Sequence, residues 1–274
     1  MSTKGLQDLL TLMDCLRDPQ NGCPWDLQQD FASIAPHTLE EVYEVIEAIE
    51  CGDHGHLTDE LGDLIFQVVF YARLGKEAGL FDFDTIIDAI TGKLLRRHPH
   101  VFPDATLASF GKKTADNADV VKARWEAIKA EERSAKLAGP ASALDDVPQA
   151  LPAILRAAKL QKRAANCGFD WPDAAGVFAK LDEEIAELHL ARSAGDAAAV
   201  EDEFGDVMFT VVNLARHLRV EPEQALRAAN RKFERRFRLL EQLVAADGLV
   251  VETLDADRLE QYWQQAKQAG NGSA

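Results

Sequence analysis

The sequence predicts an all-α protein that contains two tandem copies of one helical bundle domain. Three observations lead to this fold class. Alanine and leucine are abundant, and apolar residues recur at spacings of three and four through most of the chain. The alternating apolar and polar pattern of a half-buried strand is scarce. Finally, a set of acidic and apolar residues in the first half recurs in the same order in the second half.

The repeat is defined by two short acidic motifs. E-E-V-Y-E occupies residues 40–44 and recurs as E-E-I-A-E, while E-L-G-D at 60–63 recurs as E-F-G-D. Corresponding residues lie 143 positions apart, and the same offset relates apolar pairs such as Phe66 and Phe209. A basic segment at 93–97 recurs at an offset of 139, so the first copy has four more residues near 75–83. The chain is therefore a duplicated module.

Two helices are expected to carry the acidic motifs of the first copy. The apolar residues of 39–49 form one stripe at helical spacing. We expect this helix to begin at Thr38, because Thr38 is a suitable N-cap with Glu41 three positions later and Pro36 just before it. Residues 61–74 are apolar on most sides, so the second helix is expected to be central to a bundle.

Glycine and proline mark the boundaries between the other elements. Residues 52–55 separate the paired helices, residues 98–104 close the first half, and Gly139-Pro140 is the best linker candidate. The breakers that follow mark a helix start, its end and three later boundaries: Pro148 and Pro152, Cys167-Gly168, then Pro172, Gly195 and Pro222. We expect an N-terminal domain at 1–110, a linker helix and connection at 111–150, and a C-terminal domain at 151–274.

Composition limits the function. The net charge of −16, from 46 acidic and 30 basic residues, lacks the basic footprint of a nucleic-acid-binding protein. No apolar run approaches the roughly 18–20 residues of a membrane span, and residues 1–10 lack the apolar core of a signal peptide. The four cysteines form no CxxC pair, which favours unpaired thiols over a zinc site. We expect a cytoplasmic protein that binds neither membranes nor nucleic acid.

The acidic motifs predict a metal site in each copy. Glu184 and Glu187 are three residues apart and share one helix face, as Glu203 and Asp206 do on the next helix. The short connection 193–199 makes these two helices an antiparallel pair, so that the four carboxylates converge. Burying them together is costly unless a cation compensates. Oxygen ligands without histidine or cysteine suit Mg²⁺ or Mn²⁺.

The alternative is that these acidic residues merely solvate helix surfaces. A single ExxE means little in a chain with 46 acidic residues out of 274. Recurrence of the whole set at a constant offset, among apolar positions, favours the metal site. A di-iron or di-manganese bundle would require Glu-x-x-His on two helices, which neither copy has.

With these motifs the chain resembles the MazG family of nucleoside triphosphate pyrophosphohydrolases, in the all-α NTP pyrophosphatase superfamily. The signature is EExxE followed by ExxD, and it occurs in both copies. The resemblance extends to G-C-P-W-D at 22–26, R-R-H-P-H-V-F at 96–102, A-R-W-E-x-I-K at 123–129, G-F-D-W at 168–171 and K-F-E-R-R-F at 232–237. It implies hydrolysis of nucleoside triphosphates to the monophosphate and pyrophosphate, by a homodimer of tandem helical domains.

The resemblance also implies roles for individual residues. Metal ligands would be Glu184, Glu187, Glu203 and Asp206, mirrored in the first copy by Glu41, Glu44, Glu60 and Asp63. Because some two-copy members work mainly through the C-terminal copy, we expect the main catalytic site there. Glu183, beside the ligands, is a candidate base or supporting residue. The family can place a lysine just before its ExxD helix; residues 197–200 hold none, which puts phosphate affinity and nucleotide preference in doubt.

Basic and aromatic residues near the C-terminus are candidates for nucleotide contacts. Lys232 and Arg236 are four apart on one helix face and can grip triphosphate oxygens, or else are surface charges paired with nearby glutamates. By likeness to the family, Lys129, Trp263 and Lys267 also contact the nucleotide. For Trp263, a face for base stacking and a buried structural role are equal alternatives.

Two other classes of function remain open from sequence. One is a nucleotide sensor that holds Mg-nucleotide without turnover. The other is a helical scaffold whose acidic face docks a regulatory protein partner. A mixed arrangement would keep an active C-terminal half beside an N-terminal half retained for dimerisation or regulation.

Overall fold

The computed structural model describes residues 4–111 and 142–270 and, between these ranges, residues 117, 120, 121, 124, 125, 127–129 and 132. The chain divides into two compact units, Met1–Glu132 and Arg133–Ala274. The described residues form helices and no strand, which confirms the all-α prediction. The predicted domain boundaries stay predictions, and Gly139-Pro140 lies outside the described residues. No helix in the described part of the chain has the length and apolar character of a membrane span.

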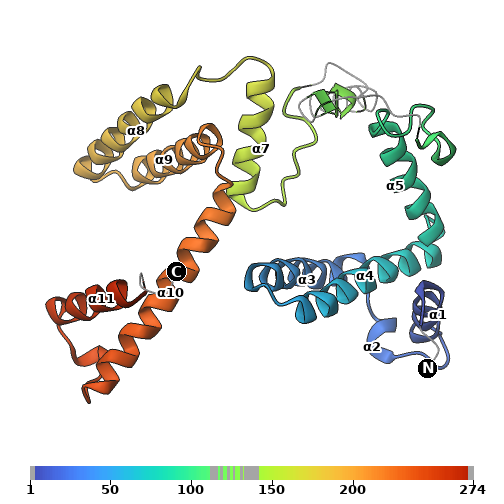
Figure 1. Ribbon diagram of the computed structural model, residues 1–274, viewed down its shortest axis with the longest axis horizontal. Coiled ribbons are helices and arrows are strands. Elements are labelled where there is room, and N and C mark those ends of the chain that lie inside the picture. The colour runs from blue at the N-terminus through green and yellow to red at the C-terminus, as the bar shows by residue number, and fades with distance from the viewer. Residues whose placement is uncertain are drawn as a thin grey trace. The chain divides into compact units, whose positions relative to one another are not determined.

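The helices of the first unit, coloured from blue to green in Figure 1, pack mainly through α4. Its elements are α1 (Leu6–Leu16), α2 (Pro24–Leu27), α3 (Phe31–Cys51), α4 (His54–Glu77), α5 (Phe83–Arg97) and the 3₁₀ turn η1 (Leu107–Ser109). Helix α4 packs against α1, α3 and α5 and places Val69, Phe70 and Leu74 in the buried core. The sequence prediction that this helix is central to its bundle is confirmed.

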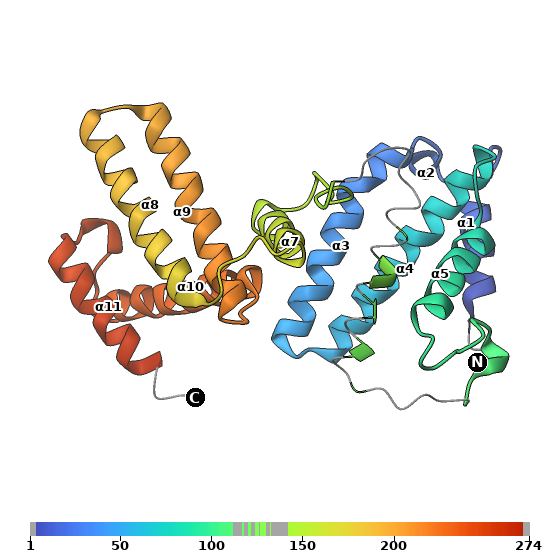
Figure 2. The same cartoon turned by 90° about the horizontal axis from the view of Figure 1, so that it is seen from above.

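The second unit repeats the helix pair. Its elements are α7 (Ala153–Asn166), α8 (Ala174–Ala194), α9 (Ala197–His217), α10 (Pro222–Ala246), the 3₁₀ turn η2 (Val251–Thr253) and α11 (Ala256–Gly270). Helices α8 and α9 lie side by side like α3 and α4, as both Figure 1 and Figure 2 show. The boundaries predicted at Pro152, Cys167, Gly195 and Pro222 match the ends of these helices. Helix α11 folds back on α10, and their shared core contains Leu240, Val244, Tyr262 and Ala266.

The turn between the paired helices has the same design in both copies. Gly52 and Gly195 end the first helix with φ of 70° and 72°, the left-handed region that glycine adopts without strain. The following residue, Asp53 or Asp196, accepts hydrogen bonds from two amide groups of the next helix. This two-residue connection makes each helix pair antiparallel, which is what brings the acidic motifs face to face.

The predicted start of the first acidic helix is wrong. Helix α3 begins at Phe31, so Thr38 and Pro36 lie inside it. The cap is Asp30, whose carboxylate accepts from the Ser33 amide while the Ser33 hydroxyl accepts from the Asp30 amide. This reciprocal cap starts the helix one turn before Pro36, which is then carried in the interior at the loss of one backbone hydrogen bond. The Thr38 hydroxyl instead lies 2.8 Å from the Tyr71 hydroxyl of α4.

Gly176 in the first turn of α8 is required by a close approach of Trp171. A Cβ at position 176 would lie 2.4 Å from Cδ1 of the indole. We expect Gly176→Ala to lower the free energy of unfolding by about 1–3 kcal/mol, because the ring must shift. A Cβ at Gly205 of α9 would have no atom within 4 Å. Gly205→Ala should therefore raise the free energy of unfolding by about 0.5–1 kcal/mol. Thermal unfolding of both variants measures this; equal effects would contradict it.

Candidate metal and nucleotide site

Each helix pair brings three carboxylates together. One oxygen from each of Glu184, Glu187 and Glu203 lies within 4.8 Å of the others, and Glu41, Glu44 and Glu60 form the same arrangement in the first copy. The innermost residues are Glu184 and Glu60, with 5% and 8% of their surface exposed. The convergence predicted from the helix faces is therefore present in both copies for three of the four carboxylates.

The fourth predicted ligand is not part of either group. Asp206 and Asp63 are not among the carboxylates that meet within 4.8 Å. Asp206 is still close enough to act on Glu203: burial raises the pKa of Glu203, and the charges of Glu187, Glu184 and Asp206 raise it further. The role of the two aspartates as ligands stays a prediction.

The clustered carboxylates fit a hard divalent cation. In the first copy burial also raises the pKa of Glu44, with contributions from the charges of Glu60 and Glu41. Such shifts show that the ionised groups repel one another and lack sufficient solvation. Carboxylate oxygens are the ligand atoms that Mg²⁺ and Mn²⁺ prefer, and a bound cation would remove the repulsion.

Sequence reasoning missed the basic side chains that contact these clusters. Lys180 Nζ lies 2.7 Å from Glu183 and 2.8 Å from Glu184, and these hydrogen bonds raise its pKa above the usual range. In the first copy His56 Nε2 lies 2.6 Å from Glu60. The signal was the spacing: each basic residue is three or four positions from a motif glutamate on the same helix.

The predicted nucleotide contacts of the second unit lie on the α10–α11 hairpin. Lys232 is exposed and Arg236 is half-buried on α10, while Lys267 is half-buried on α11. Trp263 packs against the hairpin core, with its ring centroid 5.4 Å from that of Phe233. Lys129 belongs to the first unit, where its Nζ lies 3.9 Å from the centre of the Trp125 ring. The roles of these five residues stay predictions.

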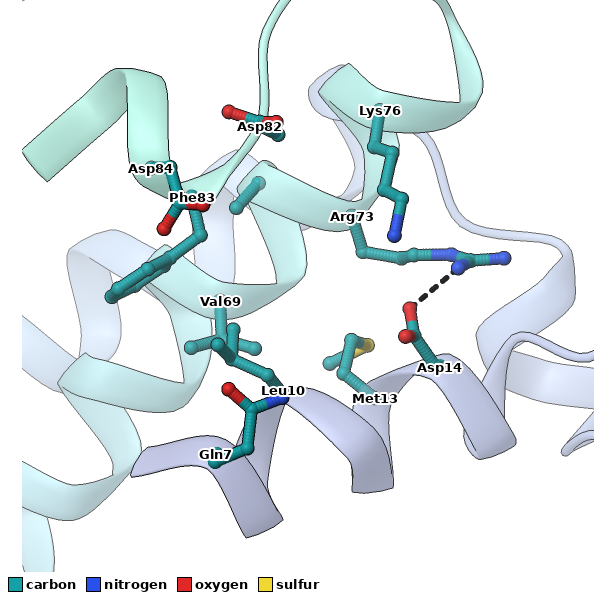
Figure 3. Close-up of a pocket in the computed structure, with 11 residues that line it drawn as sticks. Gln7, Leu10, Met13, Asp14, Val69, Arg73, Lys76, Asp82, Phe83 and Asp84 are labelled. Atoms are coloured by element: carbon teal, nitrogen blue, oxygen red, sulfur yellow. Dashed lines mark hydrogen bonds and ion pairs between the residues drawn. The ribbon is translucent and has the colours of Figure 1, made fainter. Parts of the chain in front are cut away.

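A pocket of about 200 Å³ in the first unit lies away from the carboxylates. It is shown in Figure 3, with Val69, Arg73 and Lys76 from α4 among its lining residues. These three occupy the face of α4 opposite Glu60 and Asp63. Arg73 donates to Asp14 of α1 at 2.5 Å, drawn as the dashed line, and to Glu77 at 2.7 Å. The polar groups of this pocket therefore tie α1 to α4.

Comparison with known proteins agrees with the duplicated acidic site. Residues 29–102 match the family model of the MazG nucleotide pyrophosphohydrolase domain. Residues 161–233 match the family model named phosphoribosyl-ATP pyrophosphohydrolase. Each matched segment contains one EExxE and one ExxD motif.

Two relatives extend this likeness to nearly the whole chain. A nucleoside triphosphate pyrophosphohydrolase of Escherichia coli is 54% identical over 94% of this chain and 95% of its own length. The nucleoside triphosphate pyrophosphohydrolase/pyrophosphatase MazG of Thermotoga maritima is 41% identical over 95% of both chains. With identities of this extent, the chain belongs to the MazG family of nucleoside triphosphate pyrophosphohydrolases.

Proposed function

We propose that the chain hydrolyses nucleoside triphosphates, canonical or damaged, to the monophosphate and pyrophosphate, with Mg²⁺ or Mn²⁺ held by the second carboxylate cluster. The observation that carries this proposal is the group of Glu184, Glu187 and Glu203. Their oxygens lie within 4.8 Å of one another, and Glu184 is buried. Such a group is unfavourable without a cation and is well suited to one. The role in the cell would be removal of damaged nucleotides or control of the nucleotide pool.

The ligand set would be completed by Asp206, on the same face of α9 as Glu203. A bound divalent cation supplies charge neutralisation for the triphosphate and lowers the pKa of a bound water. The chain's own residues then orient the substrate: Lys232 and Arg236 hold phosphate oxygens, Arg236 in bidentate fashion. Lys129, Lys267 and Trp263 would add further nucleotide contacts.

Glu183 is the residue we propose for accepting a proton from the attacking water or for positioning a ligand. It lies next to Glu184 in sequence and is held 2.7 Å from Lys180. Lys180 thus links the proposed base to a proposed metal ligand, since the same ammonium group contacts Glu184. Catalysis would then consist mainly of positioning and electrostatic stabilisation.

We also propose a cytoplasmic homodimer. All four cysteines are unpaired, as expected in a reducing compartment.

An apolar stripe on each acidic helix is exposed in the single chain and keeps the 143-residue offset: Leu61, Ile65 and Val68 on α4, and Phe204, Met208 and Val211 on α9. Packing against a second copy would cover these faces. Sedimentation analysis of the wild type and of Met208→Glu tests this. We expect the variant to have a lower mass in solution than the wild type, and equal masses would contradict the role of this stripe.

The test of the proposed reaction is product analysis with the purified protein, Mg²⁺ and a panel of canonical and modified triphosphates. We expect equimolar monophosphate and pyrophosphate, with no diphosphate. Release of inorganic phosphate and diphosphate instead, or tight binding without any product, would contradict the proposal.

The effect of Mg²⁺ on stability is expected to depend on pH. Because the pKa values of Glu203 and Glu44 are raised in the folded protein, the cation-free fold gains stability when these groups are protonated and loses it as pH rises through their pKa. Mg²⁺ should therefore raise the unfolding temperature at about pH 8 and have little effect at about pH 4.5, the usual range of glutamate. Thermal scans with and without Mg²⁺ measure this, with Glu203→Gln as the variant that should weaken both effects. A pH-independent Mg²⁺ effect would contradict it.

A further inference from the structure

The second unit contains an apolar pocket that the reaction described so far does not use. Its volume is about 340 Å³, within the range of pockets that hold small ligands. The walls come from α7, from α9, which packs against α7 (Figure 1), and from the segment Phe169–Trp171 between α7 and α8. Among the described residues that line it there is neither a glutamate of the metal cluster nor Lys232, Arg236, Trp263 or Lys267. The pocket is therefore distinct from the residues proposed to hold the nucleotide.

Aromatic rings form part of the pocket wall. Apolar atoms make up most of its surface, and Phe169, Trp171 and Phe209 are among its lining residues. Phe169 is 81% exposed although it is a large apolar residue. Trp171 is held against Gly176 of α8 by the close approach described above. Because aromatic rings pack well on one another, such a wall favours a ligand with a flat ring.

Three buried polar side chains interrupt this apolar surface and are incompletely paired. Gln161 donates to the Phe209 carbonyl at 2.7 Å, but its Oε1 has no hydrogen-bond partner among the described residues. The Thr210 hydroxyl makes no hydrogen bond within that part of the chain. Asn213 accepts from Arg216 at 2.7 Å, and because a guanidinium can only donate, its NH₂ group is left as a donor. A ligand that accepts hydrogen bonds would pair this donor.

The charges at the pocket cancel. Arg216 and Asp170 both line it, and Arg216 donates to Asp170 at 2.8 Å. This hydrogen bond lowers the pKa of Asp170, so the carboxylate stays ionised at neutral pH and already pairs with the guanidinium. A charged ligand would lose its solvation in a largely apolar pocket whose charges are already matched. The pocket therefore favours a neutral ligand.

The first copy has a different residue at each of two key positions. By the 143-residue offset, Thr210 corresponds to Gln67 and Asn213 to Phe70. Gln67 donates to Glu41 of the acidic cluster at 3.4 Å, and Phe70 is fully buried in the core of the first unit. A position that holds a core phenyl group in the first copy therefore holds an amide at a pocket in the second.

We propose that this pocket is a second ligand site, for a small neutral molecule with an aromatic ring and a carbonyl group. The ring would contact Phe169 and Trp171, and the carbonyl oxygen would accept hydrogen bonds from Asn213 and Thr210. Because Thr210 and Asn213 belong to α9, the ligand would contact the helix that also carries the acidic motif at 203–206.

The test is an NMR titration of the full chain with three probes of similar size. Benzamide carries the neutral carbonyl group, benzoate has a charge in its place, and toluene lacks it. We expect benzamide to saturate at one molecule per chain. Toluene should bind roughly two- to tenfold more weakly, because it forms no hydrogen bond, and benzoate more than about tenfold more weakly, because its charge loses solvation. Benzoate or toluene binding as tightly as benzamide would overturn the proposed ligand class.

Two variants locate the bound probe. Thr210→Val removes the hydroxyl and should weaken benzamide binding roughly two- to tenfold without weakening toluene binding. Ala164→Phe, on the α7 wall, should abolish binding of both probes by filling the pocket. Thr11→Val is the matched control, because Thr11 is exposed on α1 of the first unit. Wild-type affinity for benzamide in both Thr210→Val and Ala164→Phe would overturn the site.

Competition distinguishes this site from the nucleotide site. A saturating α,β-methylene nucleoside triphosphate with Mg²⁺ should leave the affinity for benzamide unchanged. Competitive displacement of benzamide by this analogue would overturn the proposal of a second site. None of these measurements depends on turnover, so the pocket is tested independently of the proposed reaction.

Discussion

Glu187→Ala is expected to reduce the rate of pyrophosphate release from Mg-triphosphate by a factor on the order of 10³, whereas Glu44→Ala leaves most of the rate intact. Glu187 supplies one of three oxygens that meet within 4.8 Å in the second copy. Loss of one oxygen from so small a group removes charge and geometry that the cation requires, and defects of this kind commonly cost a factor of about 10²–10³. The measurement is the initial rate at saturating Mg²⁺.

The two copies are expected to differ because their surroundings differ. In the first copy Glu60 is contacted by His56 and Glu41 by Gln67. In the second copy Ala199 stands at the position of His56, and Lys180 is the contacting cation. Equal losses in Glu44→Ala and Glu187→Ala would show that both sites turn over. A wild-type rate in each of the two single variants, Glu187→Ala and Asp206→Ala, would contradict the proposed metal site.

The helix pairs and their acidic faces were predictable from the sequence because they depend on local rules. Apolar spacing fixes the helices, and a glycine followed by an aspartate fixes the turn at Gly52-Asp53 and Gly195-Asp196. The constant offset then identified which acidic residues belong to the repeated motifs. Convergence of Glu184, Glu187 and Glu203 follows from these rules alone.

Other features depend on competition between local signals or on contacts far apart in the sequence. The start of α3 was predicted wrongly because Pro36, taken alone, is a stronger sign of a helix boundary than the Asp30–Ser33 pair is of a helix start. The pocket beside Phe169 was missed because its walls come from α7, α9 and a connecting segment. Motif reading found G-F-D-W at 168–171 but gave no reason for it. Tertiary packing supplies one: Trp171 packs on Gly176, and Asp170 holds Arg216.

Arg17→Met is expected to produce a large loss of stability, about 3 kcal/mol. Arg17 is 6% exposed and lies over the Phe70 ring in the core of the first unit. It donates two hydrogen bonds to Glu77, at 3.0 and 2.7 Å, and others to the backbone carbonyl groups of Asp26 and Gln29. Methionine preserves much of the volume but leaves these acceptors without their donor. Chemical denaturation of the two proteins measures the difference.

The loss should also change with pH in a defined direction. The hydrogen bond from Arg17 lowers the pKa of Glu77, with a further contribution from Arg73 and against the effect of burial. A carboxylate with a lowered folded pKa contributes stability that is present above its unfolded pKa, near 4.5, and is lost as pH falls through the folded value. Wild-type and Arg17→Met stabilities should therefore approach each other below about pH 4.5 and differ most near neutral pH.

Arg238→Met is the matched control for this prediction. Arg238 forms an ion pair with Glu234 on the same helix, and both side chains are exposed, so its removal should change stability by less than about 0.5 kcal/mol. The double variant Arg17→Met with Glu77→Met should recover part of the lost stability, because it also removes the carboxylate that Arg17→Met leaves without its guanidinium partner. A loss in Arg17→Met no larger than that in Arg238→Met would show that the buried network does not hold α1 to α4.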